Sequence, residues 1–180
     1  MVTTWRNHQT LPIVSFQDSA IAGRLDAWVV DPSKLQLCAW LCQIPGMRSR
    51  QLLLPTDVLH LDQRHIIINS QSDLVDTQDV WRLQNLVKLR YTPIGKGVYT
   101  ESGKRLGFVT DFNFDTESWY IHKLQIKPGL FSSIRTDSPY IDRRQILEVT
   151  AHRIIVQDTK SLSSHLLAQS FGPGANQSPS

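Results

Sequence analysis

This sequence of 180 residues has few of the features that mark membrane-spanning or secreted proteins. No apolar run approaches the roughly 20 residues that cross a bilayer. Neither sign of charge dominates, with 19 basic residues against 16 acidic ones. The residues after Met1 lack the apolar core of a secretory signal. We therefore expect no transmembrane segment and a cytoplasmic location, alone or at the periphery of a membrane complex.

Cysteine is scarce, and the two that occur cannot pair with each other. Cys38 and Cys42 lie on the same face of one expected strand. Residues four apart in a strand are separated by about 13 Å, too far for a disulfide. We expect both thiols to be reduced and to pack as small apolar side chains. The matching residues of the second half of the chain are His122 and Ile126, which argues against a metal pair.

Catalytic motifs are missing as well. The sequence has no G-x-S-x-G, no phosphate-binding G-x-x-x-x-G-K-S/T and no dinucleotide-binding glycine motif. Its six histidines are scattered, and none forms an H-x-x-x-H or H-E-x-x-H pair. We therefore predict a protein that is not an enzyme and that uses neither a cofactor nor a metal.

What the sequence does contain is a repeat. Glycine, aspartate and proline recur at one spacing of 84 residues: Gly23 with Gly107, Asp31 with Asp115, and Pro55 with Pro139. Repeats of this length are long enough to close a small core each, unlike the units of a solenoid. The spacing therefore predicts duplicated domains, at residues 11–70 and 93–158.

Each copy is predicted to consist of about five or six short strands, enough for a small closed or half-open β-barrel. Residues 23–30 and 35–44 form a hairpin around the turn at Asp31. Residues 106–115 and 119–126 form the corresponding hairpin of the second copy.

The segments outside the copies have different patterns. Residues 73–90 take a helical period through Leu74, Val80, Leu83, Leu86 and Val87. We predict a short amphipathic helix in a linker of residues 71–92, packed across the junction of the two barrels. Residues 1–10 are predicted to be a frayed extension and residues 159–180 a flexible tail.

Residues 94–115 resemble the opening of a PRC-barrel domain. The resemblance rests on a glycine-bearing first strand, the turn Ser102-Gly103-Lys104, the run Leu106-Gly107-Phe108-Val109, and the aspartate Asp115 that ends the second strand. The first copy resembles the family more weakly, through Gly23, Asp31-Pro32 and Leu52-Leu53-Leu54-Pro55.

The resemblance implies a mainly β fold of two tandem small PRC-type β-barrels joined by a short amphipathic helix. The family includes the barrel of the photosynthetic reaction centre H subunit and that of the ribosome maturation factor. Its members are expected to bind and stabilise larger assemblies, and no catalytic residues are defined to carry over. This chain has neither the transmembrane helix of the H subunit nor the glycine-rich N-terminal domain of the maturation factor.

Exposed aromatic and basic side chains predict the recognition surface. Trp40 shares strand parity with the two cysteines and is expected in the core. Trp119 shares parity with Lys123 and Lys127 and is expected to be exposed, as interface tryptophans beside basic residues are. The candidate contacts with a protein partner are Trp119, Lys123, Lys127, Phe131 and Arg135.

Three functions fit these observations. The leading hypothesis is a non-enzymatic adaptor or assembly factor that binds a large protein complex, of which a photosynthetic complex is one example. The alternative is a ribosome-associated or RNA-processing factor that binds rRNA or a ribosomal protein, with phosphate contacts from Arg48, Arg50, Arg143 and Arg144. The third is a peripheral membrane scaffold that associates through the linker helix, near Trp81.

Overall fold

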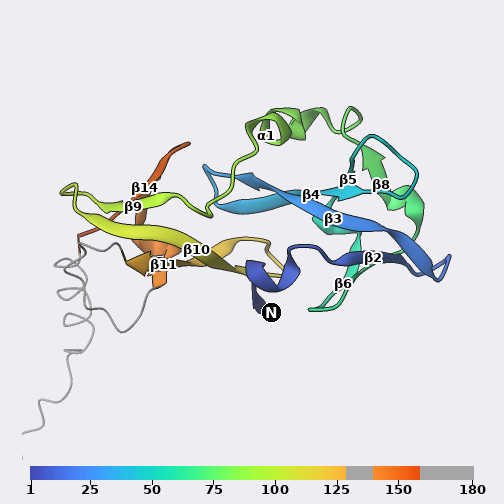
Figure 1. Ribbon diagram of the computed structural model, residues 1–180, viewed down its shortest axis with the longest axis horizontal. Helices are drawn as coiled ribbons and strands as arrows, with labels where there is room; N and C mark the ends of the chain where they lie inside the picture. Colours follow the sequence, from blue (N-terminus) through green and yellow to red (C-terminus); the bar gives the residue numbers. More distant parts are fainter. Residues whose placement is uncertain (129–139, 159–180) are drawn as a thin grey trace, which may run out of the picture.

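The computed structural model describes residues 1–128 and 140–158 and shows a mainly β protein with two seven-stranded sheets (Figure 1). The first sheet has the strand order β6-β7-β2-β3-β4-β5-β8. Its strands are β2 (Pro12–Ser15), β3 (Ala20–Asp31), β4 (Gln36–Gln43), β5 (Gln51–Leu53), β6 (Val58–Leu61), β7 (Ile66–Ile68) and β8 (Leu74–Asp76).

The second sheet has the order β12-β11-β10-β9-β14-β13, and β1 pairs with β10 outside this path. Its strands are β1 (Val2–Thr4), β9 (Gly97–Thr100), β10 (Arg105–Asp115), β11 (Ile121–Pro128), β12 (Tyr140–Asp142), β13 (Ile146–Val149) and β14 (Arg153–Val156).

The two sheets follow the same path of strands. The order β5-β4-β3-β2-β7-β6 in the first corresponds to β12-β11-β10-β9-β14-β13 in the second. Each sheet contains one parallel pair at the same place, β2 with β7 and β9 with β14. Register shifts in the long hairpins also recur 84 residues apart, between Leu25 and Ala27 and between Val109 and Asp111. Such bulges bend a sheet and increase its twist, which suits a curled half-barrel.

Matching aspartates hold the turns of the two long hairpins. Asp31 Oδ1 accepts a hydrogen bond from the backbone N–H of Ser33 at 2.8 Å, and Asp115 Oδ1 accepts one from Ser118 at the same distance. Ser118 donates hydrogen bonds to Asp115 from its N–H and from its hydroxyl group. These bonds hold the pKa of Asp115 well below its usual range.

The substitution Asp115→Asn is expected to lower the free energy of unfolding by about 1 kcal/mol at pH 7, because the charged acceptor of the turn is lost. Since folding depresses the pKa of Asp115, its contribution is present above the ordinary carboxyl value near pH 4 and is lost as the pH falls below it. Urea titrations measure the free energy of unfolding of the variant and of the wild type. The difference between the two should be smaller at pH 3 than at pH 7. Glu117→Gln, at an exposed neighbour, is the control. An equal difference at both pH values would contradict the assignment.

The two sheets join where the tips of these hairpins cross. Gln36 and Tyr120 form an antiparallel bridge, and these positions are themselves 84 residues apart. Two hydrogen bonds flank it, from the N–H of Leu37 to the carbonyl of Trp119 at 2.9 Å and from the N–H of Ile121 to the carbonyl of Leu35 at 2.8 Å. Because each position contacts its own counterpart, the two sheets are related by an approximate twofold axis through the bridge.

The core runs without a break from one sheet into the other. Trp28 of β3 lies 5.8 Å from Phe112 and 5.0 Å from Phe114 of β10, measured between ring centroids. Trp40 is fully buried, as predicted from its strand parity, and its ring lies 5.1 Å from that of Trp119. The two halves therefore share one hydrophobic core instead of enclosing two separate ones.

The linker is helical over only part of residues 73–90, where the sequence has a helical period. Leu74–Asp76 is strand β8, paired with β5, and the helix α1 spans only Gln84–Leu89. The side chains of Leu86 and Val87 pack on the outer face of the first sheet, against a cluster formed by Val29, Ala39, Leu41 and Leu52. The helix thus covers one sheet instead of the junction (Figure 1). In the described part of the chain, no helix has the length and apolar character needed to cross a membrane.

The N-terminal residues are ordered where the sequence predicts fraying. Val2–Thr4 extends the second sheet as β1, and Trp5–His8 forms one turn of 3₁₀ helix. The Trp5 ring lies 5.9 Å from that of Phe112, and His8 is buried with its Nδ1 2.8 Å from the carbonyl oxygen of Thr4. The strand pairing and the Trp5–Phe112 contact are non-local, so no periodic pattern within the first ten residues predicts them. Residues 159–180, the predicted tail, lie outside the described residues.

Candidate functional site

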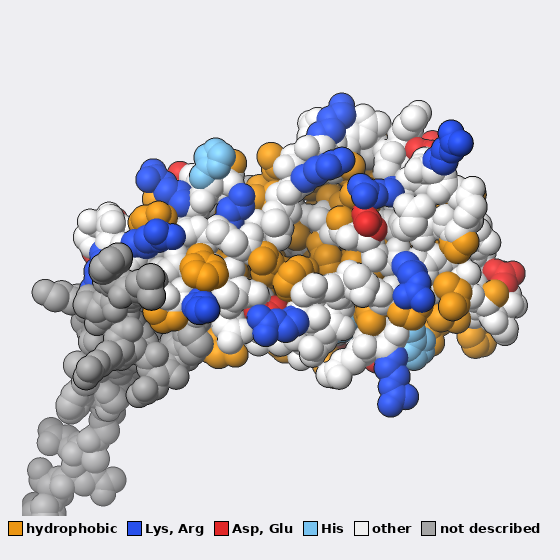
Figure 2. All heavy atoms as spheres, in the orientation of Figure 1, with side chains coloured by type: hydrophobic (Ala, Val, Ile, Leu, Met, Phe, Trp, Pro, Cys, Tyr) orange, Lys and Arg blue, Asp and Glu red, His pale blue; other side chains and the backbone are white. Residues whose placement is uncertain are grey.

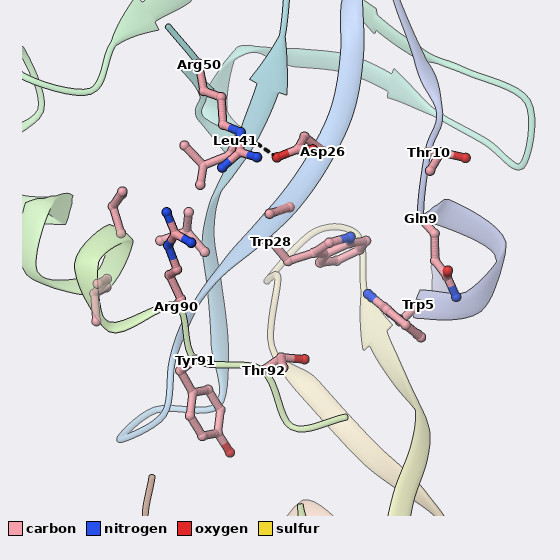
Figure 3. A pocket seen from close by; sticks show the side chains of 14 residues that line it. Trp5, Gln9, Thr10, Asp26, Trp28, Leu41, Arg50, Arg90, Tyr91 and Thr92 are labelled. Carbon is pink, nitrogen blue, oxygen red and sulfur yellow. Dashed lines mark ion pairs between the residues drawn. The ribbon is translucent and has the colours of Figure 1, made fainter. Parts of the chain in front are cut away.

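A groove of about 500 Å³ opens beside the junction of the two sheets. It is bounded by α1, by the start of the second half of the chain, by the middle of β3 and β4, and by the N-terminal segment (Figure 3). The face drawn in Figure 2 is hollowed near its middle, where hydrophobic side chains lie between basic ones. The residues that give the groove its character are Trp5, Asp26, Trp28, Arg50, Leu86 and Arg90.

The charges of the groove are unequal. Arg50 Nε lies 2.7 Å from Asp26 Oδ2, and both side chains are partly exposed. Arg90 approaches from the opposite side, with its guanidinium directed toward the same region (Figure 3). Among the described residues, no carboxylate lies within ion-pair distance of Arg90. The groove therefore carries two guanidinium groups against one carboxylate, and one positive charge remains without a counter-ion.

Arg90 also has an unusual backbone. It ends α1 in the left-handed conformation, at φ 48°, with its N–H donating to the carbonyl of Leu86 at 3.2 Å. Glycine or asparagine is the usual residue at such a position, because a larger side chain is strained there. The backbone thus places a long cationic side chain at the mouth of the groove at a small cost in stability.

The apolar side of the groove is aromatic. Trp5 and Trp28 project from different segments and lie together on the side away from α1 (Figure 3). The indole Nε1 of Trp28 and the hydroxyl of Tyr91 are buried and make no hydrogen bond to the described residues. Burial also raises the pKa of the Tyr91 phenol, so this group stays neutral at physiological pH.

The predicted protein contacts lie elsewhere, and one of them, Trp119, is only partly exposed. Trp119 is partly buried, with its ring 5.1 Å from Trp40 and stacked at 6.3 Å on Phe114. The prediction of exposure was wrong because Trp119 takes φ 61° and the register shifts at Phe114, so strand parity does not continue from Lys123. Lys123 and Lys127 are exposed on β11.

Phe131 and Arg135, with the whole loop of residues 130–139, fall outside the described residues, which resume at Tyr140. They are therefore not placed relative to Lys123 and Lys127.

The four arginines predicted to bind phosphate are not gathered on one surface. Arg50 lines the groove and is paired with Asp26. Arg144 Nε lies 3.0 Å from Asp142, and the guanidinium of Arg143 lies 4.3 Å from the centroid of the Tyr120 ring. Arg48 is exposed in the loop before β5.

One further polar cluster lies at the end of the first sheet. Asp62 accepts a hydrogen bond from the N–H of Arg64 at 2.7 Å, which lowers its pKa, and His65 Nδ1 lies 3.0 Å from the same carboxylate. His60 Nε2 lies 3.7 Å away. Within residues 1–128 and 140–158, no three His, Cys, Asp or Glu side chains are grouped as metal ligands.

The second sheet can be identified by comparison with known families. Residues 87–163 match the PRC-barrel domain family. The chain contains a PRC-barrel domain. The match spans β9 to β14, which include Gly107 and Asp115, two of the residues through which the sequence resembles the family. The sequence matches none of the curated proteins.

The groove lies at the boundary of the PRC-barrel domain. Arg90 belongs to the first residues of the matched segment, whereas Trp5, Trp28 and Arg50 come from before it. Sequence reasoning singled out Arg50 alone among these, because the residues that line the groove come from five separate stretches of the chain. A barrel by itself would not form this groove, which depends on the preceding half of the chain.

Proposed function

We propose that this chain is a non-enzymatic adaptor built from two tandem PRC-type barrels, which acts in the cytoplasm and binds a large protein assembly. A photosynthetic complex, free or at a membrane, is one such assembly. The first barrel in this proposal is residues 11–70. It is supported by the common strand order, by the recurrence of the bulges, and by glycines at matching positions, Gly23 and Gly107.

The observation that carries the proposal is the groove that depends on both halves of the chain. Its lining combines the aromatic side chains of Trp5 and Trp28 with Arg50 and Arg90. Tryptophan and arginine are the residues most enriched where protein partners contribute most binding energy. An extended segment of a partner fits such an open, mixed surface.

The structure of the basic residues favours protein over RNA as the partner. Three of the four candidate arginines are already engaged, by Asp26, by Asp142 and by the Tyr120 ring. Four phosphate contacts would weaken binding to rRNA by about 50- to 150-fold between 50 and 200 mM salt. A smaller decrease would exclude the ribosomal alternative in this form.

A peripheral membrane role rests on a different surface. Trp81 is 76% exposed beside α1, and Leu89 is 49% exposed. If these residues insert into a membrane, vesicles containing phosphatidylserine should retain the protein, and Trp81→Ala should release it. If the wild-type protein stays in solution when these vesicles are sedimented, this role is excluded.

Site-specific photo-crosslinking in the native cell tests the adaptor function. A benzoylphenylalanine introduced at Thr10, which is exposed and lines the groove, is expected to capture a protein partner. The same probe at Lys123 samples the surface predicted from sequence. Capture at Lys123 alone would move the site to β11, and nuclease-sensitive products would favour the RNA-binding alternative. The absence of protein products at both positions would contradict the proposed function.

A further inference from the structure

We infer that the groove recognises a carboxylate, carried by an aspartate or glutamate next to an apolar side chain in an extended segment of the partner protein. This inference rests on the proposed adaptor function and adds the chemical class of the segment that binds.

The charges that line the groove are not balanced. Asp26 already neutralises Arg50 across 2.7 Å, while Arg90 has no acidic neighbour in the described part of the chain. A carboxylate that enters between the two guanidinium groups completes the charge balance. Arginine binds carboxylates in a bidentate geometry, so it selects an acidic residue over a merely polar one. A basic segment would be repelled by the same pair of groups.

The groove also has an apolar surface. The apolar side chains that line it include Trp5, Trp28, Leu86 and Val87. A segment bearing only charge would leave these side chains in contact with water. The volume, about 500 Å³, lies within the range of pockets that hold a few side chains. The occupant is therefore a short stretch of chain with an apolar residue beside its carboxylate, not a folded domain.

The backbone of Arg90 is strained. A left-handed arginine at φ 48° is less stable than glycine or asparagine at the same place. Strained residues of this kind concentrate at binding sites, where the side chain has a use that offsets the strain. Among the described residues that line the groove, Arg90 is the one cation without an ion pair.

Peptide selection tests the inference directly. A displayed library of random heptapeptides is selected against the immobilised full-length chain, and fluorescence polarisation measures the dissociation constants of the selected peptides. We expect aspartate or glutamate next to Leu, Phe or Trp to be enriched. Arg90→Asn should raise the dissociation constant of these peptides at least about tenfold, as expected for a lost charge-assisted contact.

The choice of variants separates binding from folding. Asparagine tolerates the left-handed conformation, so Arg90→Asn removes the charge without straining the end of α1. Lys88→Asn is the matched control, because Lys88 is an exposed cation of the same helix that does not line the groove. It should change the dissociation constant less than about twofold.

Three results would overturn the inference. Selected peptides without acidic residues, or peptides that bind Arg90→Asn as tightly as wild type, would remove the carboxylate from the recognition. Binding of free 3-phenylpropionate as tight as that of the peptides would assign the groove to a small carboxylate instead of a protein. The first two outcomes leave crosslinking at Thr10 intact, whereas failure of the adaptor function would remove the crosslinks themselves.

Discussion

A Gly107→Ala variant is expected to lose about 3 kcal/mol of its free energy of unfolding. A Cβ at position 107 would lie 2.1 Å from the carbonyl oxygen of Lys127, which belongs to the backbone of the paired strand and cannot rotate away. The two strands of the long hairpin would have to separate, and overpacking of this kind costs 1–3 kcal/mol or more. The glycine also has φ 155°, a conformation that side chains disfavour. Urea denaturation followed by tryptophan fluorescence measures the loss.

Other glycines provide a graded control for this result. Gly103 has φ 86° and no atom within 4 Å of an added Cβ, so Gly103→Ala should cost only the backbone strain, about 1–2 kcal/mol. Gly23→Ala should fall between the two, because its Cβ would lie 2.9 Å from the carbonyl oxygen of Gln43. A loss for Gly107→Ala no greater than for Gly103→Ala would show that the hairpin accommodates the extra atom.

Phe112→Ala is expected to destabilise the protein by about 3–5 kcal/mol, the usual cost of removing a buried ring. Phe112 is 1% exposed and lies within 6 Å of both Trp5 and Trp28. Because Trp28 belongs to the first sheet, the cavity would weaken both halves at once. Hydrogen exchange followed by mass spectrometry should show faster exchange in β4 as well as in β11.

The matched control is Phe16→Ala. Phe16 is 70% exposed, so its removal should change the free energy of unfolding by less than about 0.5 kcal/mol. If Phe112→Ala speeds exchange in the second sheet alone, the two sheets unfold independently, and the continuous core would not couple them.

Most of the long strands could be predicted from the sequence, because their signals are local. The turn at Asp31 and the alternation after it place β3 and β4 within a few residues of their observed bounds. Short strands carry too little alternation for this, so β1, β8 and β12 depend on the partner strand that each one joins. Val80, Leu83, Leu86 and Val87 have helical spacing because they pack against one face of the first sheet. Leu74, which fits the same spacing, belongs instead to the shared core, as part of strand β8.

The candidate site could be predicted only in part. Arg50 stands out as a basic residue, but nothing local indicates that Asp26 neutralises it. Strand parity predicts that Trp119 is exposed, but its left-handed backbone directs the side chain against the core, where it is partly buried. Arg90 carries one detectable signal, since α1 ends at an arginine where a glycine would be expected.

The bridge between Gln36 and Tyr120 has a consequence for stoichiometry. A contact between matching positions is one that two separate chains could make as a symmetric dimer, and such a dimer would present every surface twice. In the single chain, α1 packs on the outer face of the first sheet, whereas the N-terminal turn packs against Phe112 of the second sheet. Joining the halves in one chain thus forms one groove of this kind among the described residues, and we expect a one-to-one complex with the proposed partner.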